Sequence, residues 1–270
     1  MVRLDYISLF RSARWLILPA AISFITWVQG TRVAQVASAA GLATNLWDSV
    51  ATVMLNRYAI WYFMTPIYLY LVNDLILDRG FGPAFQLRTL SRDAWWTGKI
   101  MAISGLAFMA GVVSLGTSIL VSALMMPWDT NWSDTARSGL QDVPVAPVLL
   151  THKPATIALG ACALMTLGWL LLTLVAAATT IHFRHPLIGL STGFSVYFGG
   201  VALDVLMGIN RLSQWLPHHH FVLNEIANRT GRLDLVTILG SIGYLICLSV
   251  AVITLGFGKI QDQDFPVTGG

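Results

Sequence analysis

The chain has 270 residues, of which 56% are hydrophobic and only 11% are charged, and its formal net charge is +3. A soluble domain carries about a quarter charged residues, so this composition excludes an ordinary water-soluble enzyme or binding module. Basic and aromatic residues are not interleaved in the pattern typical of nucleic-acid binding, so we expect no nucleic-acid partner. The sequence predicts an integral membrane protein that contacts membrane lipids.

Six apolar runs approach the roughly twenty residues that a helix needs to cross about 30 Å of hydrocarbon. They are Trp15 to about Val36, Tyr58 to Asn73, Ile100 to Pro127, Ala155 to Ile181, Pro186 to Met207, and Leu235 to Phe257. We therefore expect an all-α, polytopic membrane protein with six transmembrane helices, forming a single domain over residues 1–270. Two long outer loops are expected at about 128–153 and 208–234.

The first run has a short apolar core, Trp15 to Val28, and basic residues precede it. Together with "ASA" at residues 37–39, this pattern also resembles a secretory signal peptide with its cleavage site. We interpret the run as a retained helix. The segment that follows, Gln35 to Leu55, contains Asn45 and Asp48. Because charge inside a membrane is costly, we expect an interfacial helix there rather than a seventh span.

The residues before the first run show an amphipathic pattern of their own. In "RLDYISLFRSARW", Arg3, Arg11 and Arg14 fall within a narrow helical arc, and apolar residues fill the adjoining arc. We expect an N-terminal interfacial helix over about residues 3–14, lying among the lipid headgroups. Basic residues here and between the second and third runs lie on one side of the predicted topology. The positive-inside rule then places both termini in the cytoplasm.

We find no nucleotide-binding, hydrolase or metalloprotease motif in the expected structural context. "TGKI" at residues 97–100 lacks the upstream glycine and the final hydroxyl residue of a P-loop, and no H-E-x-x-H helix occurs. The letters G-x-S-x-G occur at Gly189–Gly193, but inside the fifth apolar run rather than at the strand-to-helix turn that a nucleophile elbow requires. Cys162 and Cys247 fall inside predicted spans without a CxxC spacing, so we interpret them as packing residues. We expect no catalytic residue, no bound metal and no cofactor in this chain. Energy for active work must come from a partner or an ion gradient.

The polar segment between the second and third runs, about residues 79–99, has the most informative pattern. Glycine and proline residues at 80–83 break the chain, and a short helix is expected over about residues 85–96. Its basic and aromatic residues and the lysine that follows are Phe85, Arg88, Arg92, Trp95, Trp96 and Lys99. The basic residues can share one face, while the aromatic residues settle at the membrane surface. A plain interfacial anchor is one interpretation of this helix.

The stretch "LRTLSRDAWWTGK", which opens the third run, resembles the cytoplasmic loop of type-2 ATP-binding-cassette (ABC) permeases. In that family, a short segment ending in a serine-arginine pair, followed after a few residues by Gly-Lys, forms the coupling element that docks on the ATPase subunit. The interfacial N-terminal helix, six spans with cytoplasmic ends, and a long polar insertion between the fifth and sixth spans resemble the family in layout. Residue-level resemblance is confined mainly to Gly82–Lys99 and, more weakly, to Trp215–Phe221.

The resemblance implies a permease subunit of an ATP-driven exporter in the plasma membrane of a prokaryotic cell. Two subunits, identical or related, would form the translocation path. Separate cytoplasmic ABC ATPase subunits would bind ATP and Mg²⁺, and the six residues named above would couple to them. The cargo would be a drug, a peptide, a lipid-like molecule or a polymer. Short re-entrant or interfacial helices would lie in the outer loop before the last span.

Half of the six histidines stand together in "WLPHHHF" as His218, His219 and His220. Adjacent residues of a helix point about 100° apart, so at most two of these side chains face one metal ion. By the resemblance, Pro217 to Phe221 would form the outer gate of the export path. A metal site and a pH-sensitive role are the alternatives, since histidine titrates near neutrality. For the whole chain, the rivals are a membrane-embedded metal- or haem-binding redox protein that uses these histidines and a non-catalytic membrane scaffold.

Aromatic and polar residues inside the predicted spans are the remaining candidates. Trp61 and Tyr68, together with Tyr62, Phe63 and Tyr70, would line a route for an amphipathic cargo, with exposure to lipid or packing as the alternatives. Asn73 and Asp204 are costly in lipid and would face a cavity or a partner, although the aspartate could instead be interfacial. The main predicted path residues are Trp61, Tyr68, Asn73 and Asp204.

Overall fold

A computed structural model of the chain describes residues 13–77, 92–140, 143–183, 185–207, 215–231 and 235–261. Within these ranges the chain is helical and contains no strand, which confirms the all-α prediction. Of the predicted interfacial helix over 3–14, only the last two residues are described, and they belong to the short helix η1 (Ala13–Leu16). Phe85 and Arg88 of the predicted coupling element lie outside the described residues.

Four helices of the described part are long and apolar enough to cross a membrane, as expected of a multi-pass membrane protein. They are α2 (Ile17–Ala39), which η1 extends, α7 (Arg92–Met125), α9 (Pro154–Phe183) and α13 (Leu235–Gln261). They coincide with the first, third, fourth and sixth apolar runs.

The second and fifth runs are also helical. The second run is an unbroken succession of α4 (Arg57–Ala59), the π-helix η2 (Ile60–Met64) and α5 (Thr65–Leu77). The fifth run is α10 (Pro186–Met207), whose described apolar part, Leu187–Leu203, is shorter than the four long spans.

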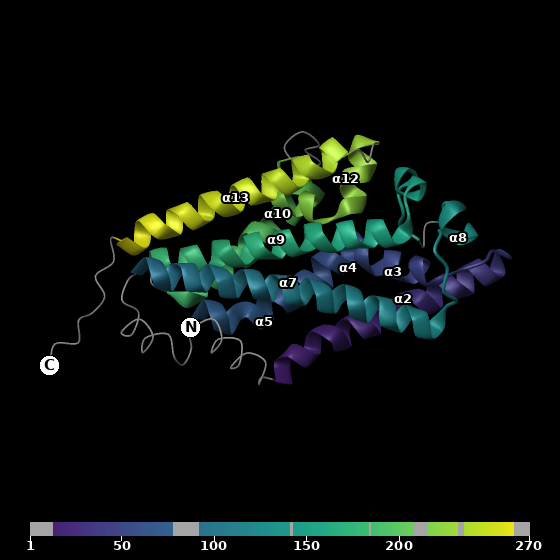
Figure 1. Cartoon of the computed structure of the whole chain (residues 1–270), viewed down its shortest axis with the longest axis horizontal. Helices are drawn as coiled ribbons and strands as arrows, with labels where there is room; N and C mark the ends of the chain where they lie inside the picture. Colours follow the sequence, from purple (N-terminus) through teal and green to yellow (C-terminus); the bar gives the residue numbers. More distant parts are fainter. Residues whose placement is uncertain are drawn as a thin grey trace.

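Helix α9 is the centre of the bundle. It contacts α7, α10, α13 and α5, while α2 packs against both α7 and α3 (Leu46–Met54). Figure 1 shows the long helices side by side, with α3, α8 (Asp134–Arg137) and α12 (Leu223–Thr230) gathered at one end. We call this the loop-rich end. Helix α7 begins and α13 ends at the opposite end.

Helix α3 lies within the segment Gln35 to Leu55, where we expected an interfacial helix. All nine of its residues are buried, because α2, α7 and α9 enclose it on several sides. The residues Gln35–Ala39 belong instead to the end of α2. Helix α3 is therefore a buried part of the protein core, and its position at the membrane interface stays a prediction.

The segment after α7, for which the sequence indicated no role, folds over the start of α3. Trp47 Nε1 donates to the carbonyl oxygen of Asp129 at 2.7 Å, and Asn45 Nδ2 donates to that of Asn131 at 2.8 Å. Thr135 Oγ1 donates to the carbonyl oxygen of Ala43 at 2.8 Å. These bonds fix the loop that leads to η3 (Pro147–Thr151) on the loop-rich end.

Asp48 is a fully buried acid at the first turn of α3. Its Oδ2 accepts the backbone N–H of Asn45 at 2.9 Å, and its Oδ1 accepts the hydroxyl of Ser133 at 2.7 Å. Asn45 Oδ1 in turn accepts the backbone N–H of Trp47 at 3.0 Å, so the N-terminus of the helix is capped. Burial raises the pKa of the Asp48 carboxyl, while the hydrogen bonds from Asn45 and Ser133 lower it, and the effect of burial is larger.

The cysteines are both free. Cys162 is buried and its Sγ donates to the carbonyl oxygen of Gly111 at 3.3 Å, which joins α9 to α7 as a packing contact. Cys247 is exposed on α13.

Candidate functional site

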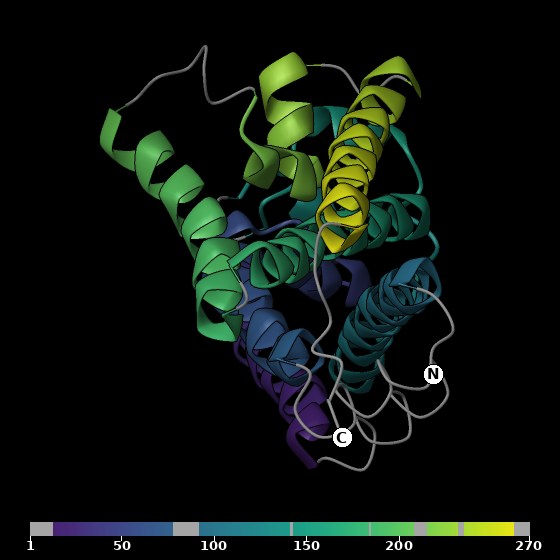
Figure 2. The ribbon, with the colours of Figure 1, turned by 90° about the vertical axis from the view of Figure 1, so that its left-hand side faces the viewer.

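The chain between α10 and α13 includes two short helices, η4 (Pro217–Phe221) and α12. Pro217 occupies the first turn of η4, where its missing N–H costs nothing. Val222 is extended and separates the two helices, and Gly231 ends α12 with φ near 60°. Helix η4 contacts α9, α10 and α13, and Figure 2 shows η4 and α12 between α10 and α13 at the loop-rich end. The segment predicted as an outer gate is therefore wedged between helices.

Phe221 is the most deeply buried side chain of η4. Its ring is fully buried and stacks on that of Tyr197 in α10, with centroids 6.3 Å apart. It lies against Gly168 of α9, where a Cβ atom would approach Phe221 Cδ1 to 2.3 Å. Only glycine leaves room for the aromatic ring at this position of α9.

His218 and His219 also point into the protein. Both are 2% exposed, and their ring centroids lie 4.0 Å from each other. The ring of Trp61 meets them edge-on, at 5.1 Å from His218 and 5.8 Å from His219. A Cβ atom at Gly200 of α10 would come within 2.7 Å of His218 Nδ1, so His218 also occupies a space that glycine leaves open.

His220 turns the other way, toward α13. Its Nδ1 lies 3.0 Å from Ser241 Oγ, and its ring centroid lies 4.3 Å from that of Tyr244. The Tyr244 hydroxyl donates to the carbonyl oxygen of Trp215. A cavity of about 400 Å³ lies beside His220 and Tyr244. The described residues contain no group of three or more histidine, cysteine, aspartate or glutamate side chains placed to hold a metal ion.

Trp61 connects the predicted path to the predicted gate. It is 2% exposed and belongs to the π-helix η2, a kind of turn often found at functional sites. Its contacts with His218 and His219 bring together two groups of residues that the sequence could only treat separately.

Tyr68 is packed between α5 and α9. Its ring stacks on Trp169 with centroids 4.6 Å apart, and its hydroxyl accepts that of Thr173 at 3.0 Å. Trp169 Nε1 donates to Thr65 Oγ1 at 2.9 Å. Within this chain, Tyr68 and Trp61 therefore have the packing role that we considered as the alternative.

The other aromatic residues of the second run face outward. Tyr62, Phe63 and Tyr70 are 46%, 54% and 47% exposed. Of the polar path candidates, Asn73 is partly buried near the end of α5, whereas Asp204 lies in α10 with a side chain outside the described residues. The structure does not bring Asn73 together with Trp61 or the histidines.

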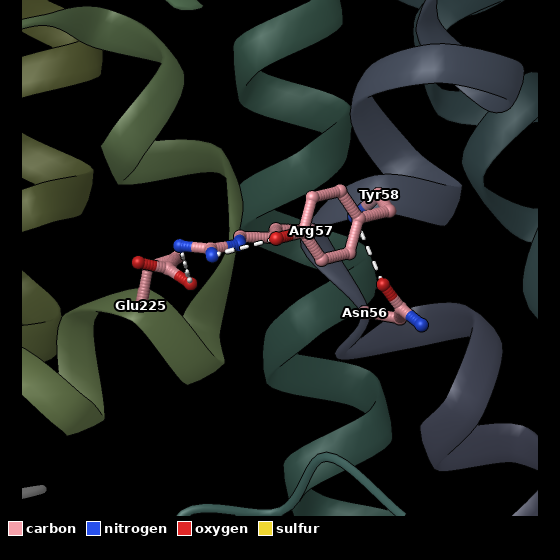
Figure 3. A network of polar contacts seen from close by, with 4 residues as sticks. All are labelled: Asn56, Arg57, Tyr58 and Glu225. Carbon is pink, nitrogen blue, oxygen red and sulfur yellow. Dashed lines mark hydrogen bonds and ion pairs between the residues drawn. The ribbon is translucent and has the colours of Figure 1, made fainter. Parts of the chain in front are cut away.

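An ion pair links the start of the second run to α12 (Figure 3). Arg57 Nη1 lies 3.5 Å from Glu225 Oε1, and Arg57 Nη2 donates to the Tyr58 hydroxyl at 2.8 Å. Asn224, the residue before Glu225, accepts the backbone N–H of Ala146 at 2.8 Å through Oδ1. Sequence reasoning missed these residues. The only signal was a polar Asn-Arg pair immediately before an apolar run.

At the opposite end of the bundle, the described coupling residues are buried. Trp95 and Trp96 were expected at the membrane surface, but both pack inside the chain, as does Lys99, whose Nζ lies 5.8 Å from the Trp95 ring centroid. Trp96 Nε1 donates to the carbonyl oxygen of Ile253 in α13 at 3.2 Å. The difference arises because α7 begins at Arg92, so these residues lie in the first turns of a packed helix. Arg92 opens α7, and its side chain lies outside the described residues.

Comparisons with protein-family models, with curated proteins and with solved structures found no match for this chain.

Proposed function

We propose that this chain is the membrane-spanning permease subunit of an ATP-driven ABC exporter. In this proposal α2, α4–α5, α7, α9, α10 and α13 are the six spans, and both termini lie in the cytoplasm of a prokaryotic cell. Two permease subunits, identical or related, form the path in the plasma membrane, and separate ABC ATPase subunits bind ATP and Mg²⁺. Support comes from the four membrane-length helices and from the two apolar helices between them.

The observation that carries the proposal is the wedge formed by η4 and α12 (217–230). Phe221 is seated on Gly168 of α9, and His218 is seated on Gly200 of α10. A small displacement of α10 relative to α9 would therefore unseat both side chains together, because close-packed interfaces switch between discrete arrangements. This property suits an outer gate built from Pro217, His218, His219, His220 and Phe221.

The path itself would lie between two permease subunits. The outward-facing aromatic residues Tyr62, Phe63 and Tyr70 are the side chains of the second span that a neighbouring subunit or a cargo can reach. Trp61 and Tyr68 would support this face from behind, since both are buried. Asn73 and Asp204 remain polar candidates toward the two ends of the path.

Coupling to the ATPase subunit would involve two groups of residues, one that binds the ATPase and one that transmits its movement to the membrane helices. Phe85, Arg88 and Arg92 would contact the ATPase subunit. Trp95, Trp96 and Lys99 would transmit its movement through the cluster in which α7 packs against α9 and α13. The burial of Trp95, Trp96 and Lys99 supports this division.

Co-purification of the full chain with its candidate ATPase tests the proposal. We expect stoichiometric ATPase and hydrolysis that responds to cargo. Arg88→Glu should weaken this association, whereas Arg137→Glu, an equal charge change at an exposed residue of α8 at the loop-rich end, should not. Unchanged assembly and hydrolysis in the Arg88 variant would contradict the coupling role. Stoichiometric haem or metal without an ATPase would favour the redox alternative.

A further inference from the structure

A second cavity at the loop-rich end has no place in the proposed gate. Its volume is about 360 Å³, and it lies between α2, the junction of α3 with α4, and α12. The charged and carboxamide side chains that line it are Gln29, Arg32, Asn56, Arg57, Asn224 and Glu225. Two guanidinium groups and one carboxylate give these six side chains a formal charge of +1.

The carboxamides make the cavity rich in hydrogen-bond donors. Asn56 Oδ1 already accepts the backbone N–H of Tyr58 at 2.9 Å, and Asn224 Oδ1 accepts that of Ala146 at 2.8 Å. With both oxygens engaged, each residue has its N–H₂ group left to offer a ligand. Donors beside two guanidinium groups select an anion over a cation.

Arg57 is held by aromatic neighbours as well as by its acid partner. Its guanidinium carbon lies 4.8 Å from the Tyr58 ring centroid and 5.8 Å from that of Trp61, and its Nη2 donates to the Tyr58 hydroxyl. The contact with Glu225 spans 3.5 Å, whereas a strong charge-assisted hydrogen bond spans about 2.7–2.9 Å. Figure 3 shows the Arg57 side chain between Glu225 and Tyr58. An anion with better geometry can replace Glu225 without displacing the guanidinium.

We propose that this cavity binds a phosphate group, and that Arg57 exchanges Glu225 for the phosphate oxygens. Guanidinium forks match the spacing of phosphate oxygens, and Arg32 supplies the second positive charge. The volume equals that of roughly a dozen waters at about 30 Å³ each, so an organic group attached to the phosphate also fits. The phosphate can come from a soluble molecule or from a lipid headgroup.

Phosphate binding in the cavity would affect α12, the helix that contacts η4 with its three histidines. Glu225 and Asn224 are neighbours on α12, and α12 contacts η4. Loss of the Arg57–Glu225 contact would free this helix from α4. The binding proposal stands without the transport proposal, since binding is measured on the isolated chain.

The test uses the full chain in a detergent without phosphate. Thermal stability and tryptophan emission are followed during titration with inorganic phosphate, with chloride at equal ionic strength as the control. A second titration uses short-chain phosphatidic acid. We expect Arg57→Gln to weaken binding about tenfold or more, as for lost hydrogen bonds to a charged group. Arg137→Gln, an equal charge change outside the cavity, should leave binding unchanged.

Glu225→Gln separates a binding role from a structural one. This variant removes the competing carboxylate, so it should bind phosphate several-fold more tightly although it loses the ion pair. Binding of inorganic phosphate with this pattern identifies a soluble ligand, and binding of phosphatidic acid alone identifies a lipid. The proposal is overturned if neither compound binds, if Arg57→Gln behaves like Arg137→Gln, or if Glu225→Gln binds more weakly.

Discussion

The ring of Phe221 lies on the backbone of Gly168, in a notch that any larger residue of α9 would fill. The two residues are 53 positions apart in the sequence, and no pattern in either segment indicates that they meet. Phe221 also stacks on Tyr197, so one side chain touches two neighbouring helices. The packing of residues 217–230 against α9 therefore requires that residue 168 carries no Cβ atom.

Gly168→Ala should destabilise the protein. The added Cβ would approach Phe221 Cδ1 to 2.3 Å, and overpacking of this kind costs about 1–3 kcal/mol. Gly160→Ala in the same helix is the matched control, since its Cβ would meet only Leu223 Cδ2 at an ordinary 3.6 Å. Alanine is the better helix former, so the control should be neutral or slightly stabilising. Thermal unfolding in detergent measures both, and equal midpoints would contradict the close packing of Phe221.

Gly200→Ala should loosen η4 and α12 without unfolding the bundle. Its Cβ would lie 2.7 Å from His218 Nδ1, while His219 and Trp61 limit the movement of that ring. Gly199→Ala is the control, because no side chain or neighbouring helix among the described residues lies within 4 Å of its added Cβ. Hydrogen exchange of the α12 amides, which reports local opening, should accelerate only in the Gly200 variant. Equal exchange in both variants would show that His218 has room to move.

The long helices could be predicted from the sequence because a helix that crosses lipid must consist almost entirely of apolar residues. A span needs about twenty apolar residues whatever its neighbours are, so α9 and α13 could be placed without knowledge of packing. The π-turn around Trp61 and the early start of α7 at Arg92 leave no such signal in the composition. Trp95 and Trp96 were therefore placed at the surface, although α13 buries them.

Contacts between distant residues account for most of what could not be predicted at the site. The charge of Asp48 led us to predict no membrane span there. Its burial is possible because Ser133, 85 positions later, donates a hydrogen bond to its carboxylate. Arg57 and Glu225 are 168 positions apart. Pro217 and the histidine triplet were found because proline and repeated histidine are local signals, but the seats at Gly168 and Gly200 are properties of the assembled helices.

Asp48 should make stability depend on pH. Burial raises its pKa in the folded state, while the unfolded chain titrates near the ordinary value of about 4. Between these two values the folded state binds more protons than the unfolded state, so the free energy of unfolding falls as pH rises. Above the raised pKa it remains at the lower level.

Asp48→Asn isolates this contribution. The amide can still accept the Asn45 N–H and can donate to Ser133 Oγ, so the cap survives without the titrating group. Thermal midpoints of the two proteins should be compared from pH 4 upward. The wild-type protein should lose stability relative to the variant as pH rises, and a difference independent of pH would contradict the raised pKa.

Gly256→Ala should disturb the packing of α7 on α13 at the end where α7 begins. The added Cβ would lie 2.4 Å from Trp96 Cζ2, and Trp96 cannot withdraw without losing its hydrogen bond to the Ile253 carbonyl. Gly258→Ala, two residues later in α13 with no atom within 4 Å of its added Cβ, is the control. We expect a lower thermal midpoint for the Gly256 variant, by the free-energy equivalent of about 1–3 kcal/mol, together with altered tryptophan emission.

The same pair of variants also separates transmission from docking at this end of the bundle. If Trp96 transmits movement through α13, Gly256→Ala should leave an ATPase partner bound but reduce the response of its hydrolysis to cargo. A docking role for Trp96 predicts the opposite, namely loss of the partner itself. Because Trp96 is fully buried against α13, we expect retained association with weakened coupling, measured by co-purification and by hydrolysis on the same sample.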